Sequence, residues 1–175
     1  LEQAPFSERD IITPSIQEPL EEQSVTVKLR TASRIQTYIY QYHPFDIIGW
    51  DGFYFPYKFN INDFMPITGK VHQPPTVHQT FKSKNFVICS FVPRLFDYHP
   101  DAIPAPYAHS NVDSDEVIYY VDGNFMSRKG IKKESITHHP IGLSHGPQPG
   151  KIEKSIGTKE TDEVAVMIDT YSPLY

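Results

Sequence analysis

Residues 109–123 read HSNVDSDEVIYYVDG, a polar turn that leads into a short apolar run. The run at 117–121 is β-branched and aromatic and ends close to Gly123, which favours a strand over a helix. Four similar runs occur at residues 25–30, 35–42, 86–92 and 164–168. Sixteen prolines and nine glycines leave no window for a long helix. The sequence therefore predicts an all-β fold, as a sandwich, a jelly roll or a barrel.

The same stretch contains a candidate metal site. Glu116 follows His109 by seven residues and Gly123 follows seven later, a spacing that resembles the first motif of cupin proteins. The Gly/Pro-rich turn at residues 140–147 resembles the second cupin motif and supplies His145. Two imidazoles and one carboxylate on one face of Fe(II) leave the opposite face open for O₂ and a chelating substrate. Asn111 replaces the usual second histidine, which favours this open iron site over a four-ligand manganese or nickel site.

Spacing alone leaves two alternatives open at this site. The three residues could be polar groups that are satisfied by hydrogen bonds at turns. Asp115 is the second choice for the carboxylate, because it lies six residues after His109. We prefer Glu116 because it directly precedes the predicted strand.

Longer strings resemble the homogentisate 1,2-dioxygenase family over roughly residues 24–175. They are HPFDIIGWDG at 43–52, PYKFN at 56–60, PYAHSN at 106–111, and His139 with HGP at 145–147. The resemblance implies cleavage of the homogentisate ring by O₂ to give maleylacetoacetate, a step of tyrosine and phenylalanine catabolism. It implies Fe(II) held by His109, Glu116 and His145. It also implies that His72 is a base that contacts the substrate, that His139 lies near substrate and oxygen, and that Tyr107 binds substrate.

Some positions depart from the family pattern and leave the substrate open. Ser110 stands where an arginine is common, Phe125 where a substrate-binding tyrosine is found, and His138 competes with His139 for the same role. One alternative is a dioxygenase for another hydroquinone acid, of the gentisate type. Others are a non-catalytic metal-binding cupin fragment and a sugar or isomerase-type cupin that needs no O₂.

The resemblance also predicts the domain organisation. Residues 1–50 would form an N-terminal arm with edge strands, the tail of a preceding β-domain in the family. Residues 51–175 would form a cupin-like jelly-roll barrel that binds iron. The proline-rich stretches at 44–80 and 93–112 are expected to be long ordered loops.

Composition limits the partners. Net charge is −5 and no cluster of lysines and arginines occurs, so we expect no nucleic acid partner. No run of about 18 apolar residues is present, so we expect no membrane span. The single cysteine, Cys89, lies in an apolar run and is expected to be buried, which fits a reducing cytoplasm. The expected partners are a small aromatic acid, O₂ and further copies of the chain.

Overall fold

The structure is a computed structural model that describes residues 4–15, 23–44, 56–105 and 107–174. The chain divides into two compact units, one of Glu8–Phe59 and one that joins Leu1–Ser7 to Asn60–Tyr175. The predicted domain boundary between residues 50 and 51 lies outside the described residues. The division into 1–50 and 51–175 therefore stays a prediction.

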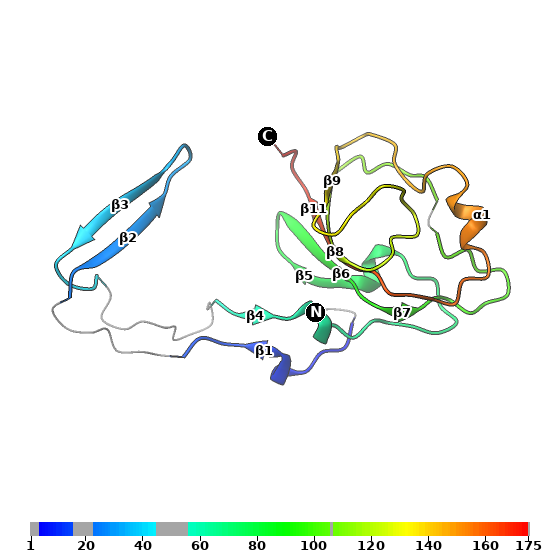
Figure 1. The fold of residues 1–175 in the computed structure, drawn as a ribbon, viewed down its shortest axis with the longest axis horizontal. Coiled ribbons are helices and arrows are strands. Elements are labelled where there is room, and N and C mark those ends of the chain that lie inside the picture. Colours follow the sequence, from blue (N-terminus) through cyan, green and yellow to red (C-terminus); the bar gives the residue numbers. More distant parts are fainter. Residues whose placement is uncertain (1–3, 16–22, 45–55, 106, 175) are drawn as a thin grey trace. The chain divides into compact units, whose positions relative to one another are not determined.

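In the described residues of the Glu8–Phe59 unit the strands form two antiparallel pairs (Figure 1). The 3₁₀ helix η1 (Glu8–Asp10) leads into β1 (Ile11–Ile12), which pairs with β4 (Lys58–Phe59). Strands β2 (Val25–Arg30) and β3 (Ile35–Tyr40) form a hairpin, in register from Val25 opposite Tyr40 to Arg30 opposite Ile35. Both strands of this hairpin follow the apolar runs that the sequence predicted.

The larger unit is built on a five-stranded antiparallel sheet in the order β5-β6-β11-β8-β9 (Figure 1). Its strands are β5 (Gln79–Lys82), β6 (Phe86–Phe91), β8 (Asp115–Asp122), β9 (Ile136–His139) and β11 (Val164–Thr170). The other elements of this unit are η2 (Ile61–Asp63), η3 (Pro75–His78), β7 (Arg94–Leu95), α1 (Lys151–Ser155) and β10 (Glu160–Thr161), and β7 pairs with β10. The strands β6, β8 and β11 confirm the three predicted runs in this part of the chain.

One face of this sheet carries the apolar core. Tyr120, Ala165 and Phe91 are directly opposed across β8, β11 and β6, so their side chains lie on the same face. Phe125, from the loop after β8, packs its ring edge-on against Tyr120 at 4.6 Å between ring centres. Cys89 lies on this face and is buried as expected, and burial raises the pKa of its thiol to about 12. The core therefore lies at one end of this face of the sheet, and the candidate site lies at the other end of the same face.

The all-β prediction is confirmed, because α1 is the one α-helix in the described ranges and has five residues. In those same ranges the pairings do not close a barrel, since β5 and β9 remain the outer strands of the sheet. The segment between β7 and β8 is rich in proline, which cannot donate a ladder hydrogen bond. The jelly-roll barrel therefore stays a prediction.

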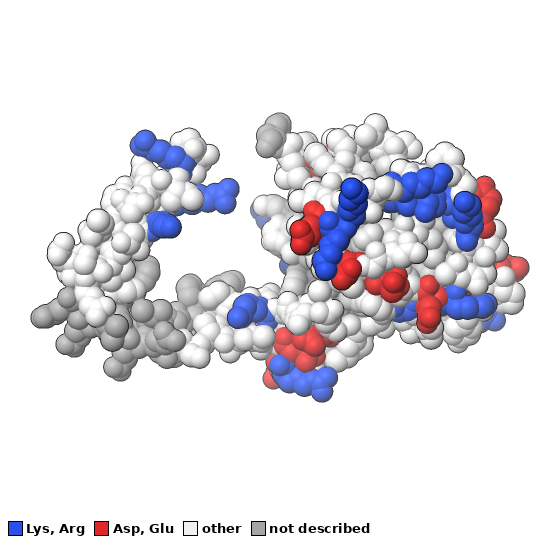
Figure 2. Space-filling model, viewed as in Figure 1, with Lys and Arg blue, Asp and Glu red and all other residues white. Residues whose placement is uncertain are grey.

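Charged side chains are visible on the face of the molecule drawn in Figure 2. Acidic and basic side chains are interspersed over the part of the larger unit in view, whereas the β2–β3 hairpin carries basic ones alone among its charged residues (Figure 2). Of the helices that the structure describes, none is long and apolar enough to cross a bilayer.

Candidate metal centre

A polar row crosses the sheet at the end opposite the apolar core. His139 on β9 is directly opposite Glu116 on β8, and Glu116 is directly opposite Asp169 on β11. Because directly opposed residues of antiparallel strands share a face, the three side chains lie on the same side of the sheet. Glu116 is inside β8 rather than just before it, since the strand begins two residues earlier than the sequence predicted.

The two predicted histidine ligands meet outside the sheet, in an isolated antiparallel bridge. The amide of His109 donates to the carbonyl of His145 at 2.8 Å, and the amide of His145 donates to the carbonyl of His109 at 2.8 Å. Their rings lie 4.5 Å apart between centres. The bridge therefore brings together two loops that lie 36 residues apart in the sequence, and it sets the spacing of the two imidazoles.

Gly146 makes this close approach possible. A Cβ built at Gly146 would lie 2.6 Å from the Cα of Ala108 and 3.1 Å from the carbonyl oxygen of Tyr107. Both are backbone atoms, which cannot turn away as a flexible side chain can. The glycine after His145 is therefore required by the backbone that carries His109.

Each of His109, Glu116 and His145 offers one ligand atom, and these atoms all lie within 4.8 Å of one another. Glu116 and His145 are almost fully buried, each with 7% of its side chain exposed. Two imidazole nitrogens and a carboxylate oxygen are donors that Fe(II) and Zn(II) accept. The predicted trio is thus assembled at one point, although its members come from β8 and two loops.

The hydrogen bonds of the two imidazoles decide where their lone pairs point. His145 Nδ1 lies 2.9 Å from the carbonyl oxygen of Leu143, and His109 Nδ1 lies 3.1 Å from that of Tyr107. A carbonyl only accepts, so each Nδ1 carries the proton and each Nε2 carries a lone pair.

The Nε2 atom of His145 tests whether a cation fits between these groups. It is buried without a hydrogen-bond partner and lies 3.6 Å from Glu116 Oε1. A lone pair and a carboxylate that face each other in a buried place repel, unless a cation or a proton lies between them. The donor set therefore fits a divalent metal ion. The Nδ1 atoms of both histidines bond to backbone carbonyls, as is usual when the other ring nitrogen of a histidine binds a metal.

His139 orients the carboxylate of this trio. Its Nδ1 lies 2.6 Å from Glu116 Oε1, and its Nε2 lies 3.2 Å from a terminal nitrogen of Arg128. A guanidinium can only donate, so Nε2 accepts and Nδ1–H donates to Glu116. The ring is stacked on that of His145 at 4.3 Å. Burial lowers the pKa of His139, an effect only partly opposed by Glu116, so the neutral imidazole is favoured.

Asp169 is a site residue that the sequence reasoning missed. Its Oδ1 is buried and makes no hydrogen bond, and it lies beside Glu116 in the polar row. Burial raises the pKa of Asp169 to about 6, with a further contribution from the charge of Glu116 and an opposing one from His109. The only signal in the sequence was an acidic residue at the end of an apolar run, and many solvated residues share that pattern.

The strand alternation separates the competing candidates. His138 is directly opposite Val117, and Asp115 precedes Glu116 by one residue, so both face away from the trio. They contact each other instead, with His138 Nε2 3.2 Å from Asp115 Oδ2. Asp115 also accepts from the amides of Ile141 at 2.6 Å and Leu174 at 2.7 Å, and these backbone hydrogen bonds lower its pKa.

The other residues considered in the sequence lie outside the trio. Tyr107 lies next to the trio, with its ring 5.8 Å from that of His109, but 68% of the residue is exposed. His72 is exposed in the loop before η3 and is not part of the cluster within 4.8 Å. Phe125 is buried in the core and has no polar atom to offer a substrate. The roles predicted for His72 and Tyr107 therefore stay predictions.

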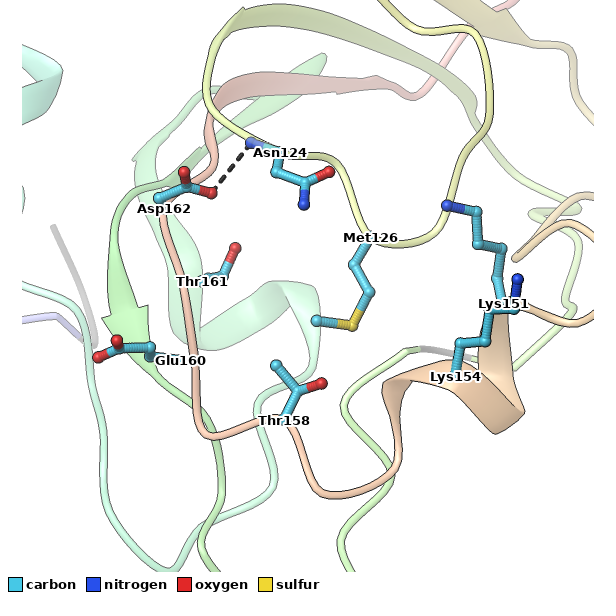
Figure 3. A pocket seen from close by; sticks show the side chains of 8 residues that line it. All are labelled: Asn124, Met126, Lys151, Lys154, Thr158, Glu160, Thr161 and Asp162. Carbon is cyan, nitrogen blue, oxygen red and sulfur yellow. Dashed lines mark hydrogen bonds between the residues drawn. The ribbon is translucent and has the colours of Figure 1, made fainter.

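A hollow of about 440 Å³ lies elsewhere in the larger unit. Figure 3 shows Lys151 and Lys154 of α1 on one side, Met126 in the middle and the segment of residues 158–162 on the other. The amide of Asn124 donates to Asp162 at its edge, at 3.0 Å. No member of the histidine and carboxylate trio lines it.

Comparison with known proteins shows similarity to proteins named as dioxygenases. Over 94% of its length the chain is 45% identical to a Saccharolobus solfataricus protein named "Putative dioxygenase", of which it covers 44%. The chain resembles part of a named dioxygenase. It is also 27% identical to the mouse homogentisate 1,2-dioxygenase, over 70% of this chain and 29% of that protein. For the homogentisate 1,2-dioxygenase of Sinorhizobium fredii the identity is 24%, over 94% of this chain and 39% of that protein.

Two facts limit what these relatives show. The chain spans less than half the length of the curated relatives it matches. No model of a known protein family matches it. The comparisons support a relationship to dioxygenases, which is the coarser part of the resemblance noted in the sequence.

Proposed function

We propose that this chain carries the Fe(II) centre of a ring-cleaving dioxygenase that converts homogentisate and O₂ to maleylacetoacetate. One observation carries the proposal. The unpaired, buried Nε2 of His145 faces the carboxylate of Glu116, with His109 within 4.8 Å, in a chain similar to named dioxygenases. A role in tyrosine and phenylalanine catabolism, a cytoplasmic location and assembly into homo-oligomers belong to the same proposal.

In this proposal His109, Glu116 and His145 hold the metal. Fe(II) held by this trio would supply open coordination positions for O₂ and substrate, together with redox activity. Glu116 contributes one negative charge, and the two neutral imidazoles contribute none. The centre therefore keeps a net positive charge that attracts an anionic substrate.

The surrounding residues fix this geometry and manage protons. The carbonyl groups of Tyr107 and Leu143 hold the two imidazoles with Nε2 unprotonated. His139 holds Glu116 through Nδ1–H and, being neutral, adds no charge that would compete with the metal. His72 remains the proposed base for the ring hydroxyl, since a neutral imidazole can accept its proton.

The direct test is reconstitution with Fe(II) under argon, followed by addition of homogentisate and O₂. We expect O₂ consumption together with the absorbance of maleylacetoacetate, and we expect both to vanish in His109→Ala and Glu116→Ala. His138→Ala is the matched control, because His138 faces away from the trio and should leave turnover intact. Iron binding in full stoichiometry without any ring cleavage would contradict the proposed reaction.

Two alternatives are separated by the same assay. Oxidation of a different hydroquinone acid, such as gentisate, in place of homogentisate would keep the enzyme class and change the substrate. The second alternative is a metal-binding part of a protein whose activity needs residues that are not in this sequence. It is suggested by the fact that the chain covers less than half of each relative. That alternative predicts metal uptake with no turnover of any acid in the panel.

A further inference from the structure

Arg128 lies beside the candidate metal centre, in the loop that follows β8, and is partly buried. Its two terminal nitrogens donate to the carbonyl oxygen of Gly146 and to Nε2 of His139. Both acceptors are electrically neutral. A guanidinium has five N–H donors and stays protonated, so three donors and a full positive charge remain available.

Within the described ranges, no carboxylate lies within ion-pairing distance of Arg128. Two other cations of the same unit do have a carboxylate partner. Arg94 pairs with Glu163 at 3.0 Å and Lys133 pairs with Asp122 at 3.2 Å. A partly buried charge without a counter-ion is costly, and such a charge next to a site is a natural place for an anionic ligand.

Glu116 does not neutralise Arg128 directly. The ring of His139 stands between them, donating to Glu116 on one side and accepting from Arg128 on the other. The guanidinium is thus separated from Glu116 by a single imidazole ring. Phe125, which lies in the same loop as Arg128, has no polar atom for a carboxylate and is buried against Tyr120.

We propose that Arg128 binds the carboxylate of the aromatic acid substrate and so selects acids over uncharged hydroquinones. The inference rests on the proposed function for the identity of the site. Arg128 would act as a specificity-determining residue, with the planar guanidinium matching the two oxygens of a carboxylate. His139 and Gly146 would hold the guanidinium in place by accepting two of its five N–H groups.

The test measures binding without chemistry. Metal-free protein is titrated by calorimetry under argon with 2,5-dihydroxyphenylacetate and with 2,5-dihydroxyphenylethanol, its uncharged analogue. We expect the wild type to prefer the acid, and Arg128→Met to weaken acid binding about 10- to 100-fold while changing binding of the alcohol little. Arg128→Lys keeps the charge without the fork and should retain part of the preference. Lys129→Met removes the neighbouring exposed cation and should behave like the wild type.

The outcomes separate this inference from the proposed reaction. Because neither O₂ nor iron is present, failure of ring cleavage does not affect the result. Equal weakening of acid and alcohol in Arg128→Met would show that Arg128 only positions His139 and Gly146, and would overturn the inference. A wild type that shows no preference for the acid would overturn it as well. Circular dichroism of each variant ensures that a folding defect is not read as lost recognition.

Discussion

Replacing Gly146 by alanine should weaken both the fold and the candidate metal centre. The added methyl group would lie 2.6 Å from the Cα of Ala108, so the backbone that carries His109 must move. Gly142 is the matched control, because it lies in the same loop at a positive φ of 76° but a Cβ there meets nothing within 4 Å. The positive φ of Gly142 makes alanine there cost about 1–2 kcal/mol. Only Gly146→Ala adds the clash, about 1–3 kcal/mol.

The two variants can be compared by urea unfolding and by metal titration. We expect Gly146→Ala to lose about 1–3 kcal/mol of stability through the clash, and to bind metal about 10- to 100-fold more weakly than the wild type. Gly142→Ala should bind metal normally, since it does not separate the two bridged loops. Unchanged metal affinity in both variants would refute the claim that this close approach sets the spacing of His109 and His145.

Three further predictions concern ionisable groups in metal-free protein. Backbone hydrogen bonds lower the pKa of Asp115 in the folded state, so its contribution to stability is present above about pH 4 and lost on acidification. Asp115→Asn should therefore be less stable than the wild type at pH 7. Urea unfolding should also show that the variant loses less free energy of unfolding than the wild type between pH 5 and pH 3. Burial and the charge of Arg94 lower the pKa of His78 to about 3, so the unfolded chain takes up a proton first as pH falls below about 6.5. Thermal melts of His78→Phe should consequently show a flatter stability profile from pH 6.5 to 4, and a profile as steep as wild type would count against this. The pKa of Asp169 is raised to about 6, so its ionisation opposes folding as pH rises from about 4 to 6. In urea unfolding, Asp169→Asn should be more stable than the wild type by on the order of 1–3 kcal/mol at pH 8 and by almost nothing at pH 4.

The sequence predicted those strands whose apolar runs are unambiguous. Strands β2, β3, β6, β8 and β11 all follow such runs, and the expectation that no long helix forms is confirmed. Strand β9 was not predicted, because Ile136-Thr137-His138-His139 is short and half polar. This strand places His139 opposite Glu116 and turns His138 away, so missing it left the choice between the two histidines open.

The cluster of the three residues predicted as ligands could be anticipated because each stands in a local motif, and their role as ligands stays a prediction. The groups around them could not, since their positions depend on pairing between distant segments. Asp169 is set opposite Glu116 by the register of β11 on β8, and Arg128 reaches His139 and Gly146 through a loop whose path the sequence does not reveal. Asp115 and Glu116 are adjacent in the sequence, and only the register of β8 shows that Glu116 shares a face with His139 and Asp169 while Asp115 lies on the other face.

The most direct test of the central claim is the stoichiometry of Fe(II) binding. Protein stripped of metal is equilibrated with Fe(II) under argon, freed of excess ion, and assayed with a chromogenic chelator. The trio predicts one tightly bound iron per chain in the wild type and in His138→Ala, and none in His145→Ala or Glu116→Ala. Binding that persists in both of these variants, or a wild type that retains no iron, would contradict the assignment of His109, Glu116 and His145 as the metal centre.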